Sequence, residues 1–534
     1  MKKITAIIML VIAVAGLWAQ NRLDPARKVA YAAQIVENFY VDEVDTTRVV
    51  EEAIKGMLKT LDPHSVYSNA EETRDLNEPL EGNFSGIGIR FQMDRDTLYV
   101  IEAIVGGPSE RVGIRPGDRI LECNDTVIAG VKMKNSQILK ILRGPKGSEA
   151  RLKVKRKGEP EVLDFMVVRE DIPINSLDAA YMVNDSVGFI SLSRFGATTA
   201  DEVRDAMSDL RRKGMRHLVI DLSDNGGGYL RSATDIAEFF LNNGDLVVYT
   251  ESPKNGRAEY VASKDGIFGD GRVVVMINQH SASASEILSG ALQDNDRGVI
   301  VGRRSFGKGL VQRPFPFPDG SMIRLTVSRY YTPAGRCIQK PYTDGDDSDY
   351  QHDMMHRYES GELTSADSIH FADSLRCTTL RLGRTVYGGG GIMPDIFVPI
   401  DTTMYSVYYR DLVARGVLNR YCMQYVDENR KALQTSYRDE DAFVSGFEVT
   451  PDMLGALRSM ADADSIAYDS TQYARSLPLI ERNVKGLIGR DLFSQATYYR
   501  VVNPLNPIFN RAVQVATDPE EYDKYLPRKS SGRE

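Results

Sequence analysis

The sequence has few of the residues on which several protein classes depend. Four cysteines in 534 residues are too few for a scaffold held together by disulfides. Lys and Arg number 66 against 74 Asp and Glu, so the net charge of −8 lacks the broad basic field of a general nucleic-acid binder. Only one long apolar run occurs, which excludes a multi-pass membrane protein. The remaining composition, 42% hydrophobic and 26% charged, is that of a globular protein, and at ~150 residues per domain the length predicts three or four domains.

The one long apolar run lies at the N-terminus and has the layout of an export signal. Lys2 and Lys3 precede an apolar run from Ile4 to Trp18, and a cleavage point is predicted at Ala19-Gln20. The run is shorter than the roughly 20 apolar residues that span a bilayer. We therefore predict a signal peptide over residues 1–20. The protein is expected to be exported, either periplasmic or extracellular, or membrane-associated if the signal is retained.

The four cysteines leave the redox state of the chain open. The first, Cys123, is far from the predicted cleavage point, so a bacterial lipid anchor there is not expected. Cys337 and Cys377 flank one polar segment and could form a disulfide in an oxidising compartment. Four unpaired thiols are the alternative.

Changes in residue pattern divide the rest of the chain. Apolar residues at helical spacing predict two helices within residues 28–61, the second stopped by an Asp-Pro pair. Residues 83–168 change to short strands between Gly-Pro and Pro-Gly-Asp turns, which predicts a small β-rich module. Residues 186–335 alternate strands and helices, so we expect an α/β core with a mostly parallel sheet. A polar, acidic segment, 338–386, interrupts this core, and residues 401–534 are predicted to be mostly helical.

Three short motifs suggest other activities, and each has a defect. Residues 302–309 contain the Gly-x4-Gly-Lys of a phosphate loop, but the last of them is a glycine where the magnesium-binding Ser or Thr is needed. Ser305 and Lys308 form the Ser-x-x-Lys of penicillin-recognising enzymes, but neighbouring glycines disfavour the helix that this motif needs. His352 and His356 have the spacing of metal ligands, in a polar segment where a solvated helix is the alternative. We therefore expect neither a nucleotide cofactor nor a metal ion.

The strongest local signal is the segment 281–286, Ser-Ala-Ser-Ala-Ser-Glu, between a buried strand and a helix. Capping explains part of it, because serine at a helix start is often followed by glutamate. The functional interpretation is a nucleophile placed where the helix dipole favours negative charge. Such a serine needs a base, for which His64, His217 and Lys308 are candidates. Lysine has a reference pKa of about 10.4, and it acts as a base only where burial without a counter-ion lowers that value.

Three glycines, 226–228, follow a buried strand that ends at Asp221-Leu222. They could form a plain turn, or they could expose backbone N–H groups towards a reacting oxygen. The pattern alone does not decide between these.

Several separate motifs, in one order, resemble the carboxy-terminal processing proteases, also called tail-specific proteases, of the S41 serine peptidases. The resemblance covers most of residues 35–400. The segments that carry it are Leu61-Asp-Pro-His-Ser-x-Tyr67, Gly86-Ile-Gly-Ile89, Asp221-Leu to Gly228, Ser281 to Glu286 with Ala291-Leu-Gln-Asp294, Phe306-Gly-Lys-Gly309, Tyr330-Tyr-Thr-Pro-Ala-Gly335 and Gly391-Ile-Met-Pro-Asp395. The last two resemble the closing strands of the family.

The resemblance implies a multidomain α/β fold. We expect an α/β protease core of the ClpP/crotonase-like type with an inserted β-rich PDZ domain, N-terminal helices and a helical C-terminal region. The boundaries that we expect are a signal peptide at 1–20, an N-terminal helical region at 21–80, the PDZ domain at 81–168, the protease core at 169–400 with the polar insertion 338–386, and the helical region at 401–534.

The resemblance also implies roles for individual residues. The implied catalytic residues are Ser283 as nucleophile, Lys308 as base and Gln312 to orient the lysine, and the implied backbone oxyanion donors are Ala284, Gly227 and Gly228. Ser223 and Gly226 replace the arginine and proline that are usual in the family, so the oxyanion donor could shift by one residue.

In the PDZ domain, the peptide-binding loop implied by the resemblance consists of Gly86, Ile87, Gly88 and Ile89. Its glycines let the backbone approach a carboxylate, and we expect Ile87 and Ile89 to supply an apolar wall. Arg143 resembles an arginine that contacts the protease body in some relatives, so we expect a regulatory role for it; a solvated turn arginine is the alternative.

Together these features predict an exported serine endopeptidase that needs no cofactor. Its expected partners are protein or peptide substrates with free, apolar C-termini, not nucleic acid, and a second copy of the chain bound through the C-terminal helices. The alternative function is an exported PDZ scaffold with an inactive protease fold.

Overall fold

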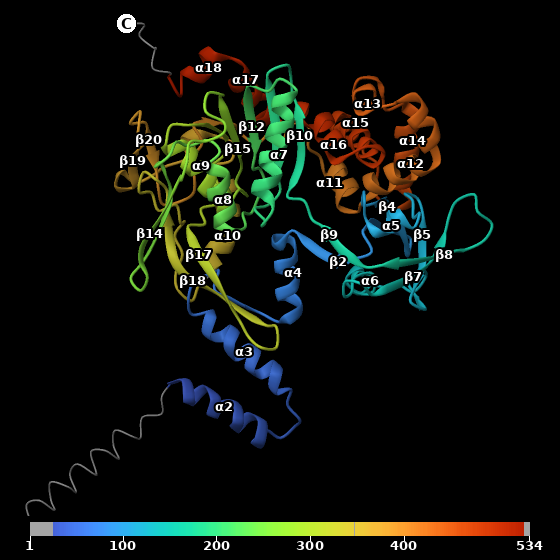
Figure 1. Ribbon diagram of the computed structural model, residues 1–534, viewed down its shortest axis with the longest axis horizontal. Helices are drawn as coiled ribbons and strands as arrows, with labels where there is room; N and C mark the ends of the chain where they lie inside the picture. The colour runs from blue at the N-terminus through green and yellow to red at the C-terminus, as the bar shows by residue number, and fades with distance from the viewer. Residues whose placement is uncertain (1–24, 347, 528–534) are drawn as a thin grey trace, which may run out of the picture. The chain divides into compact units, whose positions relative to one another are not determined.

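The computed structural model describes residues 25–346 and 348–527 of the chain, which form two compact units (Figure 1). Residues 25–73, 312–326 and 342–351, apart from 347, make up the smaller unit. Residues 74–311, 327–341 and 352–527 make up the larger one. The predicted signal peptide lies outside the described residues. No helix within the described ranges is long and apolar enough to cross a membrane.

The smaller unit contains the two predicted N-terminal helices. These are α2 (Pro25–Phe39) and α3 (Thr46–Leu58). After α3, the Asp62 carboxylate accepts hydrogen bonds from Ser65 Oγ at 2.6 Å and from Thr326 Oγ1 at 2.9 Å, which ties the end of the helical segment to residues 312–326. Strand β1 (Val66–Ser68) pairs antiparallel with the first residues of β18 (Met322–Tyr331). Helix α4 (Ala70–Glu81) then leads into the larger unit.

Residues 83–173 form the predicted β-rich module. Its sheet has the strand order β3-β4-β5-β7-β8, with β6 paired to β5. The elements are β3 (Ile89–Asp94), β4 (Thr97–Ala103), α5 (Pro108–Arg111), β5 (Arg119–Cys123), β6 (Thr126–Val127), α6 (Asn135–Leu142), β7 (Glu149–Lys155) and β8 (Leu163–Val168). Outside this sheet, β2 (Asn83–Gly86) pairs antiparallel with β9 (Glu170–Pro173), so the chain enters and leaves the module side by side.

The α/β core contains a six-stranded sheet in the order β10-β11-β12-β15-β16-β21. The first pair is antiparallel and the others are parallel, which confirms the predicted, mostly parallel sheet. The strands are β10 (Leu177–Met182), β11 (Val187–Leu192), β12 (His217–Asp221), β15 (Val273–Ile277), β16 (Val299–Gly302) and β21 (Ile396–Phe397). The central strand β15 is buried along its whole length, as parallel strands covered on both faces are.

Helices cover both faces of this sheet (Figure 1). On one face, α7 (Thr199–Arg212), α8 (Leu230–Ala237) and α9 (Ala284–Asp294) share one apolar core with the strands. On the other face, α17 (Pro507–Thr517) packs Ile508 and Phe509 against the strands. The last helices, α17 and α18 (Pro519–Asp523), therefore complete the α/β core from the far end of the chain.

The helices between Val407 and Val502 form an apolar core of their own. They are α11 (Val407–Ala414), α12 (Val417–Ser436), α13 (Glu440–Gly446), α14 (Pro451–Ala463), α15 (Ser470–Leu492) and α16 (Gln495–Val502). Helix α12 also contacts the β-rich module. Asp427 pairs with Arg119 Nη2 at 3.3 Å, and Gln424 Nε2 donates to Asp94 Oδ2 at 3.1 Å. The mostly helical prediction for this region is confirmed.

The polar insertion 338–386 is folded. It contains α10 (Ser348–Glu359), two 3-10 turns and the hairpin of β19 (Arg376–Thr378) and β20 (Thr385–Tyr387). Before it, β17 (Leu310–Pro316) pairs with β18, and the last residues of β18 pair with β13 (Leu246–Ser252), which pairs with β14 (Gly256–Val261).

The alternation of strands and helices predicted for residues 186–335 is confirmed. The predicted closing strands are wrong. In 330–335 only Tyr330 and Tyr331 belong to a strand, and 391–395 is irregular backbone that precedes β21. Each segment contains a proline, which cannot donate to a strand ladder.

All four cysteines carry free thiols. Cys123 and Cys422 are buried, whereas Cys337 and Cys377 are partly exposed, and no disulfide joins the latter pair in the described structure.

Candidate active site

Ser283 occupies the junction between strand β15 and helix α9. Its backbone has φ 54° and ψ −112°, a conformation that residues other than glycine adopt at a cost of order 1–3 kcal/mol. Such strained backbone is characteristic of a strand-to-helix turn that presents a nucleophile. The Ser283 side chain is half-buried, at the N-terminus of a helix whose dipole favours negative charge.

The two neighbouring serines of the Ser-Ala-Ser-Ala-Ser segment are fully buried and bonded to backbone. Ser281 Oγ donates to Leu222 O at 2.7 Å, and Ser285 Oγ donates to Asn225 O at 2.9 Å. Both bonds fasten the start of α9 to the loop after β12. The alternating serines therefore divide into two structural hydroxyls and one, on Ser283, that is partly accessible.

The glycine loop after β12 lies against Ser283. A methyl group on Gly227 would lie 2.8 Å from Ser283 Cβ and 2.9 Å from Ala284 N, closer than real contacts allow, and its φ is +100°. Only glycine is therefore compatible with this position.

The backbone N–H groups at this loop are not equivalent. Gly227 N–H donates to Asn225 Oδ1 at 2.9 Å. Within residues 25–346 and 348–527, neither Ala284 N–H nor Gly228 N–H donates a hydrogen bond to the protein. Of the three predicted oxyanion donors, Gly227 N–H thus already has an acceptor within the protein. Gly228 is the neighbouring residue to which the sequence analysis allows the assignment of the donor to shift.

Glu286 joins the Ser283 segment to the Lys308 segment. Its carboxylate is fully buried and accepts from Ser283 N at 2.8 Å, Lys308 N at 2.9 Å, Gly307 N at 2.7 Å and Ser305 Oγ at 2.5 Å. Burial raises the pKa of Glu286, and these hydrogen bonds act in the opposite direction. The structure thus brings the backbone N–H groups of Ser283 and Lys308 to the same carboxylate oxygen, Oε2 of Glu286.

Tyr330 makes a second link between the same two segments. Its hydroxyl lies 3.2 Å from Ser283 O and also contacts Lys308 O, and the ring is buried. Lys308 itself is half-buried in a loop, 303–309, that has no helix or strand. The Ser-x-x-Lys interpretation fails here because Ser305 is fully buried, outside any helix, with its hydroxyl bonded to Glu286.

Gln312 is on β17, four residues after Lys308. Its amide nitrogen donates to Thr326 Oγ1 on β18 at 3.3 Å, and both residues belong to the smaller unit. The histidine candidates for the base lie elsewhere. His64 Nε2 bonds Tyr350 OH at 2.7 Å, and His217 Nδ1 accepts from Arg272 N at 3.2 Å.

The predicted peptide-binding loop precedes β3, an edge strand that pairs only with β4 among the described strands. Gly88 has φ +73°, and its O accepts from Ile104 N at 3.0 Å. Ile87 is buried in the core of the module, whereas Ile89 is half-buried. Ile87 therefore packs into the core of the module, and the apolar wall of Ile87 and Ile89 stays a prediction.

Arg143, the predicted regulatory residue, ends helix α6. Its guanidinium pairs with Glu78 of α4 and lies 4.8 Å from the centre of the Phe84 ring. It is therefore not a solvated turn arginine; its partner belongs to the helix that leads into the module.

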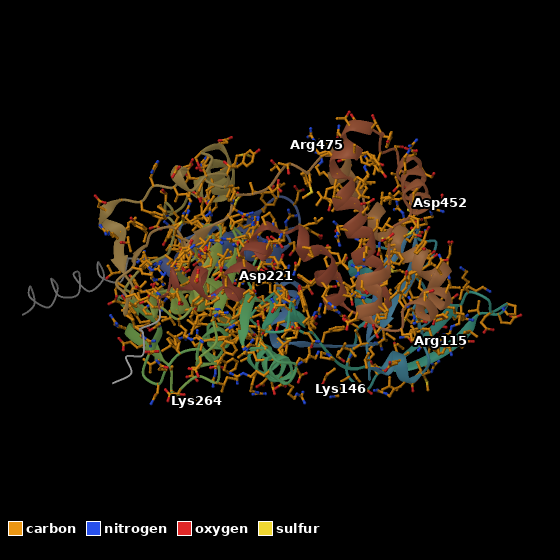
Figure 2. All side chains as sticks on the ribbon, turned by 90° about the horizontal axis from the view of Figure 1, so that it is seen from above. Arg115, Lys146, Asp221, Lys264, Asp452 and Arg475 are labelled. Atoms are coloured by element: carbon orange, nitrogen blue, oxygen red, sulfur yellow. The ribbon has the colours of Figure 1, made fainter. Side chains whose placement is uncertain are left out.

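Asp221 is a second buried carboxylate, at the end of β12. Figure 2 labels it among the interior side chains, whereas the labelled Lys146 and Lys264 lie at the periphery. Burial, together with the like charges of Asp224 and Asp178, raises the pKa of Asp221 to about 6, although Ser223 N donates to it at 2.9 Å.

The predicted metal pair does not form a site. His352 and His356 are both exposed on α10. No group of three or more His, Cys, Asp or Glu residues in the described chain is arranged to hold a metal ion.

The sequence explains Glu286 as part of a helix cap, and its hydrogen bond from Ser283 N confirms this. Sequence reasoning missed its bonds from Gly307 N and Lys308 N. A signal was present, because the sequence of α9 has no charged face on which a glutamate would be solvated. A glutamate in such a helix needs several internal donors.

Comparison with known proteins covers most of the chain. Residues 186–349 match peptidase family S41, residues 85–167 match the PDZ domain, and residues 16–73 match the family described as the activating protease CtpB N-terminal domain. Residues 408–494 match a family of unknown function, DUF8443.

Two curated relatives have similar sequences. The carboxy-terminal processing protease CtpB of Bacillus subtilis is 35% identical over 326 residues, which cover 60% of this chain and 67% of the relative. The carboxy-terminal-processing protease of Bartonella bacilliformis is 33% identical over 337 residues, which cover 62% of this chain and 77% of the relative. Among solved structures, the photosystem II D1 C-terminal processing protease matches with 25% identity and a TM-score of 0.35, covering 70% of this chain and 93% of that one.

Proposed function

The chain belongs to the carboxy-terminal processing proteases of peptidase family S41, and we propose that it is an endopeptidase that cleaves with a Ser283–Lys308 dyad. One observation carries this proposal. A single buried carboxylate, Glu286, accepts from the backbone N–H of Ser283 at 2.8 Å and from that of Lys308 at 2.9 Å. Residues 25 positions apart in sequence are thereby held together at a strained, partly accessible serine.

The proposed reaction needs a neutral amine on Lys308. The amine takes the Ser283 Oγ proton as that oxygen attacks the substrate carbonyl carbon, which forms a tetrahedral intermediate with a negative oxygen. The C–N bond then breaks, and the proton passes from Lys308 to the leaving amine. Water, deprotonated by the same lysine, attacks the acyl-enzyme. The bond from the acyl carbon to Ser283 Oγ then breaks, the lysine returns the proton to that oxygen, and the new carboxylate leaves.

Two backbone donors are proposed for the negative oxygen. Ala284 N–H is the first N–H of α9, and Gly228 N–H follows the engaged Gly227. Both lie on segments that pack around Ser283, and fixed N–H dipoles stabilise such an oxygen without reorganisation. For Gln312, the family resemblance alone supports the proposed role of orienting the lysine amine.

We propose that the PDZ domain captures the free C-terminus of the substrate. The open edge of β3 supports this, because an extended peptide can add there as a further strand while the preceding loop receives the carboxylate. The N-terminal apolar run supports export of the protein.

Covalent labelling tests the proposal without knowledge of the natural substrate. A fluorophosphonate should form an adduct on Ser283, located by mass spectrometry of peptides. Lys308→Arg should abolish labelling, because arginine keeps the charge but does not deprotonate. Lys146→Arg, on the surface of the PDZ domain, should label like the wild type. Absence of an adduct would favour the inactive PDZ scaffold instead, and an adduct on another serine would overturn the assignment of Ser283 as nucleophile.

A further inference from the structure

The loop that carries Lys308 has no regular secondary structure, so its backbone depends on partners from elsewhere. Residues 304–309 lie between β16 and β17. Buried N–H and C=O groups without partners are costly, and such a loop keeps one conformation only if its groups are satisfied individually. One set of partners comes from the segment around Ser283. Glu286 accepts from the N–H groups of Gly307 and Lys308, and Phe306 N donates to Ser281 O at 2.9 Å.

A second partner of the loop backbone is Arg357 of helix α10, in the polar insertion. Its guanidinium donates to Arg304 O at 2.7 Å and to Ser305 O at 3.1 Å. Its side chain is only 3% exposed, and Glu362 accepts from it at 2.6 Å. The same Glu362 accepts from Arg304 at 2.6 and 2.7 Å. The planar fork of arginine suits this arrangement, in which one group bonds two carbonyls and a carboxylate.

A second contact from α10 reaches the loop through Lys340. Asp353 Oδ2 accepts from Lys340 Nζ at 2.9 Å, and that nitrogen lies 4.1 Å from the centre of the Phe306 ring. Lys340 N also donates to Gly307 O at 2.9 Å. The Lys340 side chain is 5% exposed and that of Asp353 is 25% exposed. Burial lowers the pKa of Lys340, and Asp353 opposes this by stabilising the charged amine.

Asp353 and Arg357 are four residues apart on one helix and therefore project from the same face. The neighbouring pair His352 and His356, which the sequence singled out for its spacing, has the same separation but is exposed. The face of α10 that contacts the lysine loop is thus displaced by one residue from the face that the metal motif suggested.

We infer that α10 positions the catalytic lysine. Arg357 directly, and Asp353 through Lys340, hold residues 304–308 against Glu286, so that Lys308 stays aligned with Ser283. Neither residue touches a reacting atom, so both are positioning residues. This inference rests on the proposed function. A displacement of a catalytic group by about 1 Å can lower the rate of the chemical step roughly 100-fold. Residues that hold the Lys308 loop in place can therefore affect the rate without contacting the substrate.

The test compares variants on α10 in the full-length protein. Turnover of a reporter protein with a tail of three apolar residues and a free carboxylate gives kcat and KM. Fluorophosphonate labelling gives a rate at Ser283 without a substrate. Arg357→Met should lower kcat and the labelling rate by roughly 10–100-fold while KM stays within about twofold. Asp353→Asn should lower both rates by a smaller factor, and Asp353→Glu, which keeps the carboxylate, should recover most of the loss.

The matched controls are Glu359→Gln and His356→Gln, exposed on the same helix, which should behave like the wild type. If Arg357→Met does not fold, kcat, KM and the labelling rate of Arg357→Lys and Asp353→Asn are compared with those of the wild type instead. Unchanged kcat and labelling rates in folded Arg357 and Asp353 variants would overturn the inference, as would a rise in KM with kcat unchanged. If the wild type is not labelled, the proposed function itself fails, so the two failures are distinguishable.

Discussion

Two buried carboxylates of the α/β core, Asp221 and Glu286, have surroundings that give them different properties. Asp221 receives a backbone hydrogen bond from Ser223 and faces the like charges of two other aspartates. Glu286 receives four hydrogen bonds, from three backbone N–H groups and one hydroxyl. Each carboxylate therefore supports a prediction of its own.

Replacing Asp221 by Asn should stabilise the protein at neutral pH. The pKa of Asp221 is raised to about 6 in the folded state, so the unfolded chain ionises first as pH rises from about 4 to 6 and the folded state loses relative stability over that window. At pH 7 the substitution should add about 1–3 kcal/mol, and below pH 4 the difference should vanish. Thermal melting at pH 4 and pH 7 measures this, with the exposed Asp270→Asn as control. A difference independent of pH would contradict it.

Replacing Glu286 by Gln should lower kcat by at least about tenfold, because glutamine has one acceptor oxygen where the carboxylate has two, so its NH2 group would face either Gly307 N–H or the N–H groups of Ser283 and Lys308. Glu202 is a matched control. It too accepts several hydrogen bonds, from Ser176 N, Ser176 Oγ and Leu177 N among others, but it makes no contact with Ser283 or Lys308. Glu202→Gln should lower the melting temperature without lowering the kcat of the folded enzyme. Equal effects of the two substitutions on kcat would show that Glu286 has no special role.

At the scale of elements, the PDZ domain forms ion pairs with two helices outside it, α4 and α12. Arg143 at the end of α6 pairs with Glu78 of α4, and Arg119 on β5 pairs with Asp427 of α12. The second contact, together with that of Gln424 with Asp94, places the DUF8443 region against strands β3 and β5 of the module.

Arg143→Ala should lower turnover by roughly fivefold or more while leaving peptide binding unchanged. Glu78→Gln should reproduce this effect, and the double variant should lose no more than either single variant, because both remove one contact. Turnover of the reporter protein, and peptide affinity measured in the Ser283→Ala background, give the two readouts. Turnover at the wild-type rate in both single variants would show that Arg143 has no regulatory role.

At the scale of the whole molecule, the α/β core is completed by residues distant in sequence. Helix α17 covers one face of the sheet with Phe509, which packs 5.3 Å from Phe189 ring centre to ring centre. Phe509→Ala should cost about 3–5 kcal/mol and lower the melting temperature clearly. Phe39→Ala, on the exposed face of α2, is the control and should change little. Equal melting temperatures for Phe509→Ala and the wild type would show that α17 is not part of the core.

The sequence predicted the parts of this molecule that depend on local pattern. The buried run Val273 to Ile277 and the serines after it indicate a strand followed by a helix start, and both form there. What the sequence could not predict depends on long-range contacts. Strand β14 is exposed along its whole length, so it has no alternation of apolar residues. The hydrogen bond from Arg357 to Ser305 O joins residues 52 positions apart, and the sequence around either residue does not indicate it.

The family resemblance names the residues of the candidate site, but the sequence does not indicate the hydrogen bonds that connect them. Ser283 and Lys308 could be named from the family resemblance, whereas the engagement of Gly227 N–H depends on the orientation of Asn225. Likewise, nothing in the sequence indicates that the Ser305 hydroxyl donates to Glu286.

The central claim is that Ser283 attacks and Lys308 removes its proton, and turnover of the reporter protein by point variants tests it most directly. Ser283→Ala and Lys308→Arg should each lower turnover by about a thousandfold or more, with unchanged melting temperatures. Ser289→Ala, further along the same helix, should retain most activity, because its hydroxyl bonds only the backbone of α9 in the described structure. Substantial turnover by folded Ser283→Ala or Lys308→Arg protein would contradict the account.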